Sequence, residues 1–176
     1  MKKESKKKFQ VNDLEADWGG FLVDADAVAA LPFFDRAAKA TAHDDPDIVR
    51  EAWDQRRTIV TSNGRDFLRY IQEFQNPPNN PSCKDLWGLL VIPNAQLARE
   101  RGLESVRRGL SVLQREQLRW PGAALLNLYV RLTDTGQVEI RRFKRCPFCE
   151  HPERGVHIAK PWDTWYRSLP IVGGAP

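Results

Sequence analysis

The chain has 176 residues, of which 41% are hydrophobic and 28% charged; this is the composition of a globular protein that is long enough to bury one core. It has no uninterrupted apolar run of bilayer-spanning length, and the start MKKESKKKF lacks the apolar stretch of a secretory signal. We therefore expect a cytoplasmic location and no membrane partner. Three cysteines in such a chain do not predict a disulfide framework.

Charge is distributed unevenly along the chain. The net charge is +4, and residues 1–10, with five lysines and one glutamate, account for all of it. Residues 20–54 hold eight acids and three bases, whereas residues 95–119 hold six arginines and three glutamates. A phosphodiester enzyme would use carboxylates to hold cations and arginines to hold phosphates. A solvated tail and ordinary charged helix faces explain the same counts.

The first part of the chain predicts a flexible start followed by a strand and a helix. Residues 1–17 are rich in lysine and polar residues, which predicts a basic, flexible N-terminal segment. The apolar run Phe21-Leu22-Val23 predicts a buried strand that ends at Asp24 and Asp26. Residues 27–40 are helix-prone, with a proline that marks a kink or a second helix start.

A helix, a strand and another helix are predicted next. Asp45 followed by Pro46 is a good pair for the N-cap and first residue of a helix, and apolar residues follow at helical spacing to about residue 56. Residues 58–61 predict a short buried strand, and residues 62–64 a turn. Asp66 then begins a further amphipathic helix.

The remaining elements complete an α/β pattern. Residues 76–84 contain three prolines and three asparagines and predict a surface loop, whereas residues 86–92 predict a buried strand and residues 95–119 a helical region. The alternation up to this point predicts a mainly parallel central sheet with helices on its faces. Apolar and polar residues alternate over 128–143 on both sides of an Asp-Thr-Gly turn, which predicts a β-hairpin. We divide the chain into a main domain over 18–119 and a hairpin with an irregular tail over 120–176.

Aspartates fall where a parallel sheet binds its ligands, beyond the carboxyl ends of the strands. Asp24 and Asp26 end the first predicted strand, Asp66 follows the second, and Asp45 starts the helix between them. Carboxylates crowded together repel each other unless a cation joins them, and Mg²⁺ or Mn²⁺ suits an all-oxygen site. Such an ion could activate a water and stabilise charge on a phosphate.

Purely structural roles explain several of these acids equally well. Asp45 and Asp66 could each cap the helix that follows them, and capping is our first choice for Asp26. Asp24 is harder to explain in this way because an acid that follows a buried strand needs a partner. Asp44 and Asp47 are interpreted as surface acids.

Three segments resemble the PIN-like nucleases, and the resemblance spans about residues 18–115. The first is FLVDAD over 21–26, the second DPDIVREA over 45–52, and the third TIVTSNGRDF over 58–67; the run WGLLVI over 87–92 resembles the next core strand. The likeness is to small PIN-like proteins related to toxin ribonucleases. It implies a three-layer PIN fold, dependence on Mg²⁺ or Mn²⁺, and endonucleolytic cleavage of RNA, with an antitoxin protein and a second copy of the chain as candidate partners.

The resemblance also implies roles for individual residues. It makes Asp24, Asp45 and Asp66 the catalytic acids and, with Asp26, the metal ligands, although Asp47 competes with Asp45 for the middle position. The groups that would contact RNA are Asn63, Arg65, Arg107 and Arg108. The rival interpretation is a non-catalytic PIN-like module that binds RNA or a protein.

Cysteines near the end of the chain form a second motif. Cys146 and Cys149 have the spacing of a zinc knuckle, with His157 as a further ligand and Cys83 as a distant one. A redox dithiol and two unconnected thiols are the alternatives. A zinc-stabilised interaction protein is therefore a third functional class. The adjacent basic run 141–145 could hold nucleic acid.

Overall fold

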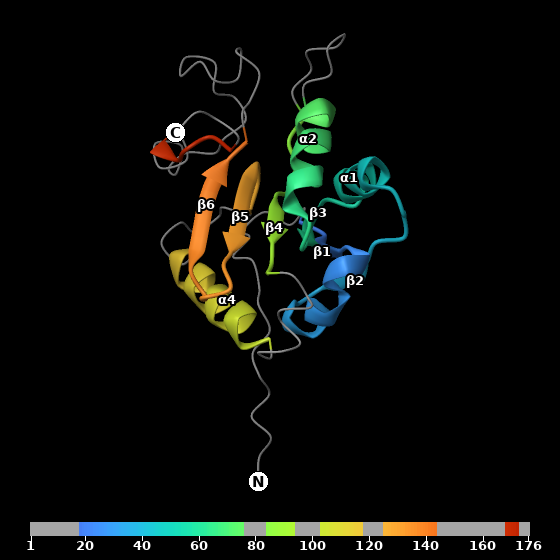
Figure 1. The fold of residues 1–176 in the computed structure, drawn as a ribbon. Coiled ribbons are helices and arrows are strands. Elements are labelled where there is room, and N and C mark those ends of the chain that lie inside the picture. The colour runs from blue at the N-terminus through green and yellow to red at the C-terminus, as the bar shows by residue number, and fades with distance from the viewer. Residues whose placement is uncertain (1–17, 76–83, 94–102, 118–124, 144–167, 173–176) are drawn as a thin grey trace.

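The computed structural model describes residues 18–75, 84–93, 103–117, 125–143 and 168–172. Its elements follow one another in an α/β order (Figure 1). They are β1 (Gly20–Val23), the 3₁₀ helix η1 (Ala25–Phe33), β2 (Ala37–Lys39), α1 (Asp45–Asp54), β3 (Arg57–Thr61), α2 (Gly64–Gln75), β4 (Leu89–Val91), α4 (Glu104–Gln117), β5 (Leu128–Leu132) and β6 (Val138–Arg142). No helix in these ranges has the length and apolar character needed to cross a membrane.

The described strands form one six-stranded sheet in the order β2-β1-β3-β4-β5-β6. All neighbours are parallel except β5 and β6, which form an antiparallel hairpin. The expected mainly parallel α/β sheet is thus confirmed. The hairpin, predicted as an addition to the main domain, joins the same sheet because β5 pairs with β4 over Leu89↔Tyr129 to Val91↔Arg131.

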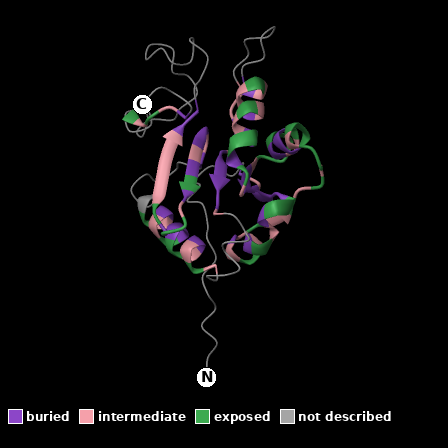
Figure 2. Cartoon of the chain, in the orientation of Figure 1, coloured by how far each residue is buried: buried purple, intermediate pink, exposed green. Residues whose placement is uncertain are grey.

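Alternating apolar side chains give the sheet two buried faces, one for each of two layers of helices. Phe21 and Val23 of β1 pack on the side of η1 and α4, whereas Leu22 packs on the side of α1 and α2. Figure 1 shows α1 and α2 together on one side of the strands and α4 on the other, and Figure 2 shows the central strands as buried. The result is a helix–sheet–helix arrangement, as near-continuous apolar strands require.

The segment over 27–40 is not the helix that its composition predicts. It forms the 3₁₀ helix η1 and then the short strand β2. Pro32 lies inside η1, and a proline has no backbone N–H to donate to an α-helical ladder. β2 pairs with β1 over Phe21↔Ala37 to Val23↔Lys39, which prevents the wholly buried strand β1 from becoming an exposed edge.

The strand order places a topological switch point at the carboxyl ends of β1 and β3. From β1 the chain moves outward to β2, and it then returns to place β3 on the opposite side of β1. The segment after β1 covers one face of the sheet and the helix after β3 covers the other. Such a topological switch point is where open α/β sheets bind their ligands.

Candidate active site at the carboxyl ends of β1 and β3

Asp24 is the buried acid at this edge, with 9% of its surface exposed. It is the N-cap of η1, where its Oδ1 accepts a 2.7 Å hydrogen bond from the backbone N–H of Ala25. Its Oδ2 lies 3.0 Å from the Thr61 hydroxyl at the end of β3. The partner that a buried acid needs is therefore supplied by the neighbouring strand.

Asp26 meets the same hydroxyl from the first turn of η1. Its Oδ1 lies 3.2 Å from Thr61 Oγ1 and accepts a 3.0 Å hydrogen bond from the backbone N–H of Ser62. Our expectation that Asp26 caps the helix is wrong, because Asp24 holds that position and Asp26 lies inside the helix. Asp26 is exposed, so it presents a carboxylate to solvent beside the buried Asp24.

Asp66 and Asn63 come from the loop and helix that follow β3. Asp66 lies in the first turn of α2, which begins at Gly64, so it does not cap a helix starting at Phe67. The side-chain amide of Asn63 donates a 2.7 Å hydrogen bond to Asp66 Oδ2. Both side chains are exposed, and the backbone N–H of Asn63 in turn donates to Thr61 Oγ1 over 3.0 Å.

Asp45 completes the group from the start of α1. It is the first helical residue, and the N-cap is Asp44, so Asp45 does not play the capping role that its place before Pro46 predicts. Partial burial raises the pKa of the Asp45 carboxyl, and the charges of Asp66 and Asp26 raise it further. These charges place Asp45 in the group of acids.

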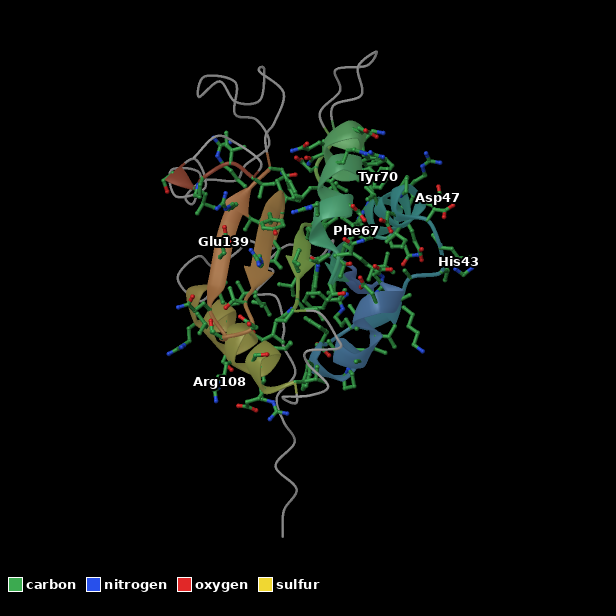
Figure 3. The ribbon with its side chains drawn as sticks, viewed as in Figure 1. His43, Asp47, Phe67, Tyr70, Arg108 and Glu139 are labelled. Carbon is green, nitrogen blue, oxygen red and sulfur yellow. The ribbon has the colours of Figure 1, made fainter. Side chains whose placement is uncertain are left out.

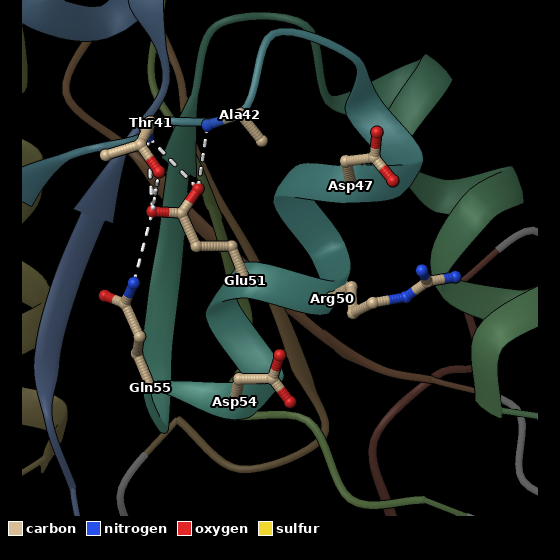
Figure 4. Close-up of a pocket in the computed structure, with 7 residues that line it drawn as sticks. All are labelled: Thr41, Ala42, Asp47, Arg50, Glu51, Asp54 and Gln55. Carbon is tan, nitrogen blue, oxygen red and sulfur yellow. Dashed lines mark hydrogen bonds between the residues drawn. The ribbon is translucent and has the colours of Figure 1, made fainter.

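Asp47 faces a different part of the surface. It lines a shallow pocket of about 340 Å³ together with Thr41, Ala42, Arg50, Glu51, Asp54 and Gln55 (Figure 4). Figure 4 shows Glu51 pointing toward Thr41 and Ala42, while Arg50 points the other way. The backbone N–H groups of Thr41 and Ala42 donate to Oε2 of Glu51, over 3.1 and 3.0 Å. Burial alone would raise the pKa of Glu51, but these hydrogen bonds outweigh it and lower the pKa.

Burial and like charges disfavour the ionised forms of the acids at this edge. Burial raises the pKa of Asp24 above its ordinary value of 3.8, and the charge of Asp26 raises it further. The hydrogen bonds from Ala25 and Thr61 oppose this shift but do not cancel it. The four acids of the predicted site, Asp24, Asp26, Asp45 and Asp66, are thus linked by their charges in the folded chain, and burial together with these like charges raises the pKa of Asp24 and of Asp45.

The donor chemistry of this edge fits a hard divalent cation. Every side chain in it offers carboxylate, amide or hydroxyl oxygen, the ligands that Mg²⁺ and Mn²⁺ prefer. Across the described ranges, no three His, Cys, Asp or Glu side chains are arranged so that they could hold one ion. Mg²⁺ commonly uses only one or two protein carboxylates and completes its shell with waters and substrate phosphates, so a pair of these acids suffices for it.

The arginines predicted to contact RNA lie in two places. Arg65 is exposed in the first turn of α2, one residue before Asp66. Arg107 and Arg108 lie on α4, where both guanidinium groups are within 3.7 Å of Glu104. Figure 3 shows Arg108 at the far end of the molecule from Asp47. Arg65 therefore belongs to the acidic edge, whereas the α4 pair belongs to the layer that covers the other face of the sheet.

Thr61 and Ser62 are the parts of the site to which our sequence reasoning assigned no role. The available signal was a hydroxyl residue directly after the buried run Thr58–Val60, at a strand end that precedes an acid. The predicted zinc ligands Cys146, Cys149 and His157, with Cys83, lie outside the described residues.

Comparison of the chain with protein-family models, with curated proteins and with solved structures finds no match.

Proposed function

We propose that this protein is a metal-dependent endoribonuclease of the PIN-like kind. The observation that carries the proposal is the gathering of Asp24, Asp26, Asp45 and Asp66 from three separate segments at the switch point of the sheet. An arrangement that raises the pKa of two acids costs stability, and such clusters are typical of sites that take a cation or carry out acid–base chemistry.

The residues at this edge have distinct roles in the proposed reaction. Asp24 and Asp66 would be direct ligands of Mg²⁺ or Mn²⁺, and Asp26 and Asp45 would contact the ion through the waters that complete its shell. A bound divalent ion supplies positive charge to the scissile phosphate and lowers the pKa of water. Thr61 fixes the orientation of Asp24 and Asp26 through its hydroxyl. Asn63 orients Asp66, and the exposed Arg65 is available to a phosphate of the substrate.

Cleavage of mixed RNA by the purified protein, with Mg²⁺ or Mn²⁺ added, tests this proposal. We expect the wild type to cut RNA and the Asp24→Asn/Asp66→Asn double variant to lose at least about a hundredfold in rate, because both carboxylates would be ligands of the ion. Cleavage should also stop when EDTA removes the divalent ions.

Asp47→Asn is the control, since it makes the same Asp→Asn change on α1 at a position that faces the separate pocket. It should cleave at close to the wild-type rate. If the wild type cleaves nothing with either metal yet binds RNA, the non-catalytic binding module becomes the better interpretation. Equal loss in Asp47→Asn would contradict the assignment of Asp45 to the site.

A further inference from the structure

The sheet has a polar, partly exposed face on β5 and β6. Leu128, Val130 and Leu132 of β5 pack into the core beneath η1 and α4. Because side chains alternate along a strand, Tyr129 and Arg131 point to the opposite face, the side of α1 and α2. Figure 2 shows β6, at the far side of β5 from the buried β4, as mostly intermediate in exposure.

Four side chains make up this face, and we call them the hairpin face: Tyr129, Arg131, Glu139 and Arg141. They form two directly opposed cross-strand pairs, Tyr129↔Arg141 and Arg131↔Glu139. Glu139, labelled on β6 in Figure 3, lies between the two guanidinium groups. Its carboxylate is 3.9 Å from Arg131 Nη1 and accepts a hydrogen bond from Arg141 Nε.

The two arginines remain accessible in this arrangement. The side chain of Arg131 is 56% exposed and that of Arg141 38%. Tyr129 is half-buried, and burial raises the pKa of its phenol while the two arginine charges oppose the rise, so the ring stays neutral near pH 7. The hairpin face therefore combines two accessible guanidinium groups with one aromatic ring.

Strand register connects the hairpin face to the acidic edge. Thr61 is paired with Val91, and Val91 is paired with Arg131. Neighbouring strands lie about 4.8 Å apart, so the Cα atom of Arg131 lies roughly 10 Å from that of Thr61. Val91 also packs beneath Gly64, the first residue of α2, since a Cβ atom at Gly64 would lie 2.5 Å from Val91 Cγ2. Arg131 is therefore two strands away from the hydroxyl that holds Asp24 and Asp26.

We propose that the hairpin face binds the backbone of single-stranded RNA and leads it to the acidic edge. Planar guanidinium groups match phosphate oxygens in pairs. Part of the Tyr129 ring packs against the core cluster of α1 and α2, and its exposed part offers a stacking surface for a base. A spacing of roughly 10 Å between the Cα atoms of Arg131 and Thr61 is short enough for one RNA strand to contact both surfaces. This inference rests on the proposed nuclease function, and it names the surface that holds the substrate.

Binding measured without cleavage tests this inference. The probe is a fluorescein-labelled 2′-O-methyl oligouridine of about 12 nucleotides, followed by fluorescence anisotropy in EDTA over a series of salt concentrations. We expect Arg131→Gln/Arg141→Gln to bind about tenfold more weakly. Its slope of log affinity against log salt should be smaller by about 1.4, since each phosphate contact to a single strand contributes about 0.7.

Arg107→Gln/Arg108→Gln is the matched comparison, because it removes the same charge from the opposite layer, where the resemblance places RNA contacts of its own. If the hairpin face binds the RNA, the affinity of this variant stays within about twofold of the wild type. Glu139→Gln should bind several times more tightly, since it frees both guanidinium groups and removes a negative charge from the path of the phosphates. A purely structural role for the hairpin face would not produce that gain.

Two outcomes would overturn the inference: unchanged affinity in Arg131→Gln/Arg141→Gln, or a larger loss in the α4 control than in the hairpin variant. A duplex of the same length bound as tightly as the single strand would contradict the proposed substrate class. The result is independent of catalysis, because EDTA prevents metal-dependent cleavage. If RNA binds through the hairpin face and is never cut, the nuclease proposal fails, while the assignment of the hairpin face as an RNA-binding surface stands.

Discussion

The hydroxyl of Thr61 has a single proton and lies within 3.2 Å of carboxylate oxygens from both Asp24 and Asp26. It can donate to only one of them at a time. The other carboxylate lacks this hydrogen bond. Burial, and after it the charge of Asp26, raises the pKa of Asp24. The folded protein is therefore less stable with an ionised Asp24 than it would be with a neutral side chain at this position.

Asp24→Asn should for this reason stabilise the protein while it abolishes the site. The folded pKa of Asp24 is raised, so its contribution to stability is complete below the unfolded value of about 3.8 and is lost as pH rises through the folded pKa. At pH 7 without divalent ions, we expect the variant to melt a few degrees above the wild type, as measured by circular dichroism. The difference should shrink as the pH approaches 4.

Added Mg²⁺ should reverse this order. A cation that binds only the folded state raises the melting temperature of the wild type, and the variant should gain less. Asp47→Asn should respond to Mg²⁺ as the wild type does, because Asp47 lies outside the group. A wild type that is indifferent to millimolar Mg²⁺ and to Mn²⁺ would count against a cation site at this edge.

Residue spacing predicted which acids follow the strands but not how they meet. Asp24, Asp26 and Asp66 could be selected because each stands at the end of an apolar run. The role of Thr61 could not be read in the same way, since its two partners lie 35 and 37 residues away in sequence. Their proximity depends on β1 and β3 being neighbours, which only the strand order determines.

Elements with strong apolar patterns were predictable, and weakly patterned ones were not. β3 and α1 contain most of their residues or a regular stripe of them in the core. β2 instead has the sequence Ala-Ala-Lys, and its residues are half-buried or exposed. A strand of three small or charged residues carries no alternation that could be distinguished from a helix. It exists because β1 needs a partner on its second edge, and that requirement appears only once the sheet is assembled.

Asn127 joins three elements at the opposite edge of the sheet, and its removal should be costly. Its side-chain oxygen accepts 3.0 Å hydrogen bonds from Gln75 Nε2 at the end of α2 and from the backbone N–H of Leu86 just before β4. Its amide donates to Asp85 over 2.9 Å, and its φ is +57°. Asn127→Ala would leave two buried donors unsatisfied and place alanine in a left-handed conformation.

We expect Asn127→Ala to lower the free energy of unfolding by about 2–4 kcal/mol, as measured by urea denaturation. Asn63→Ala is the control, because Asn63 is exposed and its loss should change stability by about 0.5 kcal/mol or less. Equal effects of the two substitutions would show that the buried network does not hold α2, β4 and β5 together.

At the scale of the whole molecule, a segment near the end of the chain extends the sheet beyond β6. Ile171 forms a parallel bridge with Arg142. The backbone N–H of Arg142 donates to Pro170 O over 3.0 Å, and that of Val172 donates to Arg142 O over 2.9 Å. Val172 is buried in the same cluster as Phe143 and the helices α1 and α2. The segment is therefore part of the core.

Val172→Ala should destabilise the protein by about 1.5–2.5 kcal/mol, from the loss of two buried carbon groups and the space they leave. The midpoint of urea denaturation should fall with an unchanged slope. Val28→Ala, the same substitution at a half-exposed position of η1 outside both core clusters, should lower the midpoint much less. An unaffected midpoint in Val172→Ala would mean that the segment rests on the sheet without contributing to its stability.

The separation of Thr61 from its two acids also has a consequence for the order of folding. The hairpin of β5 and β6 pairs residues that are close in sequence, such as Leu132 and Val138, and hairpins of this kind form within about 1–10 μs. The acidic edge instead requires the closure of a segment of 35 to 37 residues, and parallel pairing of this kind is intrinsically slow. The hairpin face can thus form early from local pairing, whereas the carboxylates come together only when the parallel strands have paired. A partly folded chain would therefore present the hairpin face before the acids of the acidic edge are assembled.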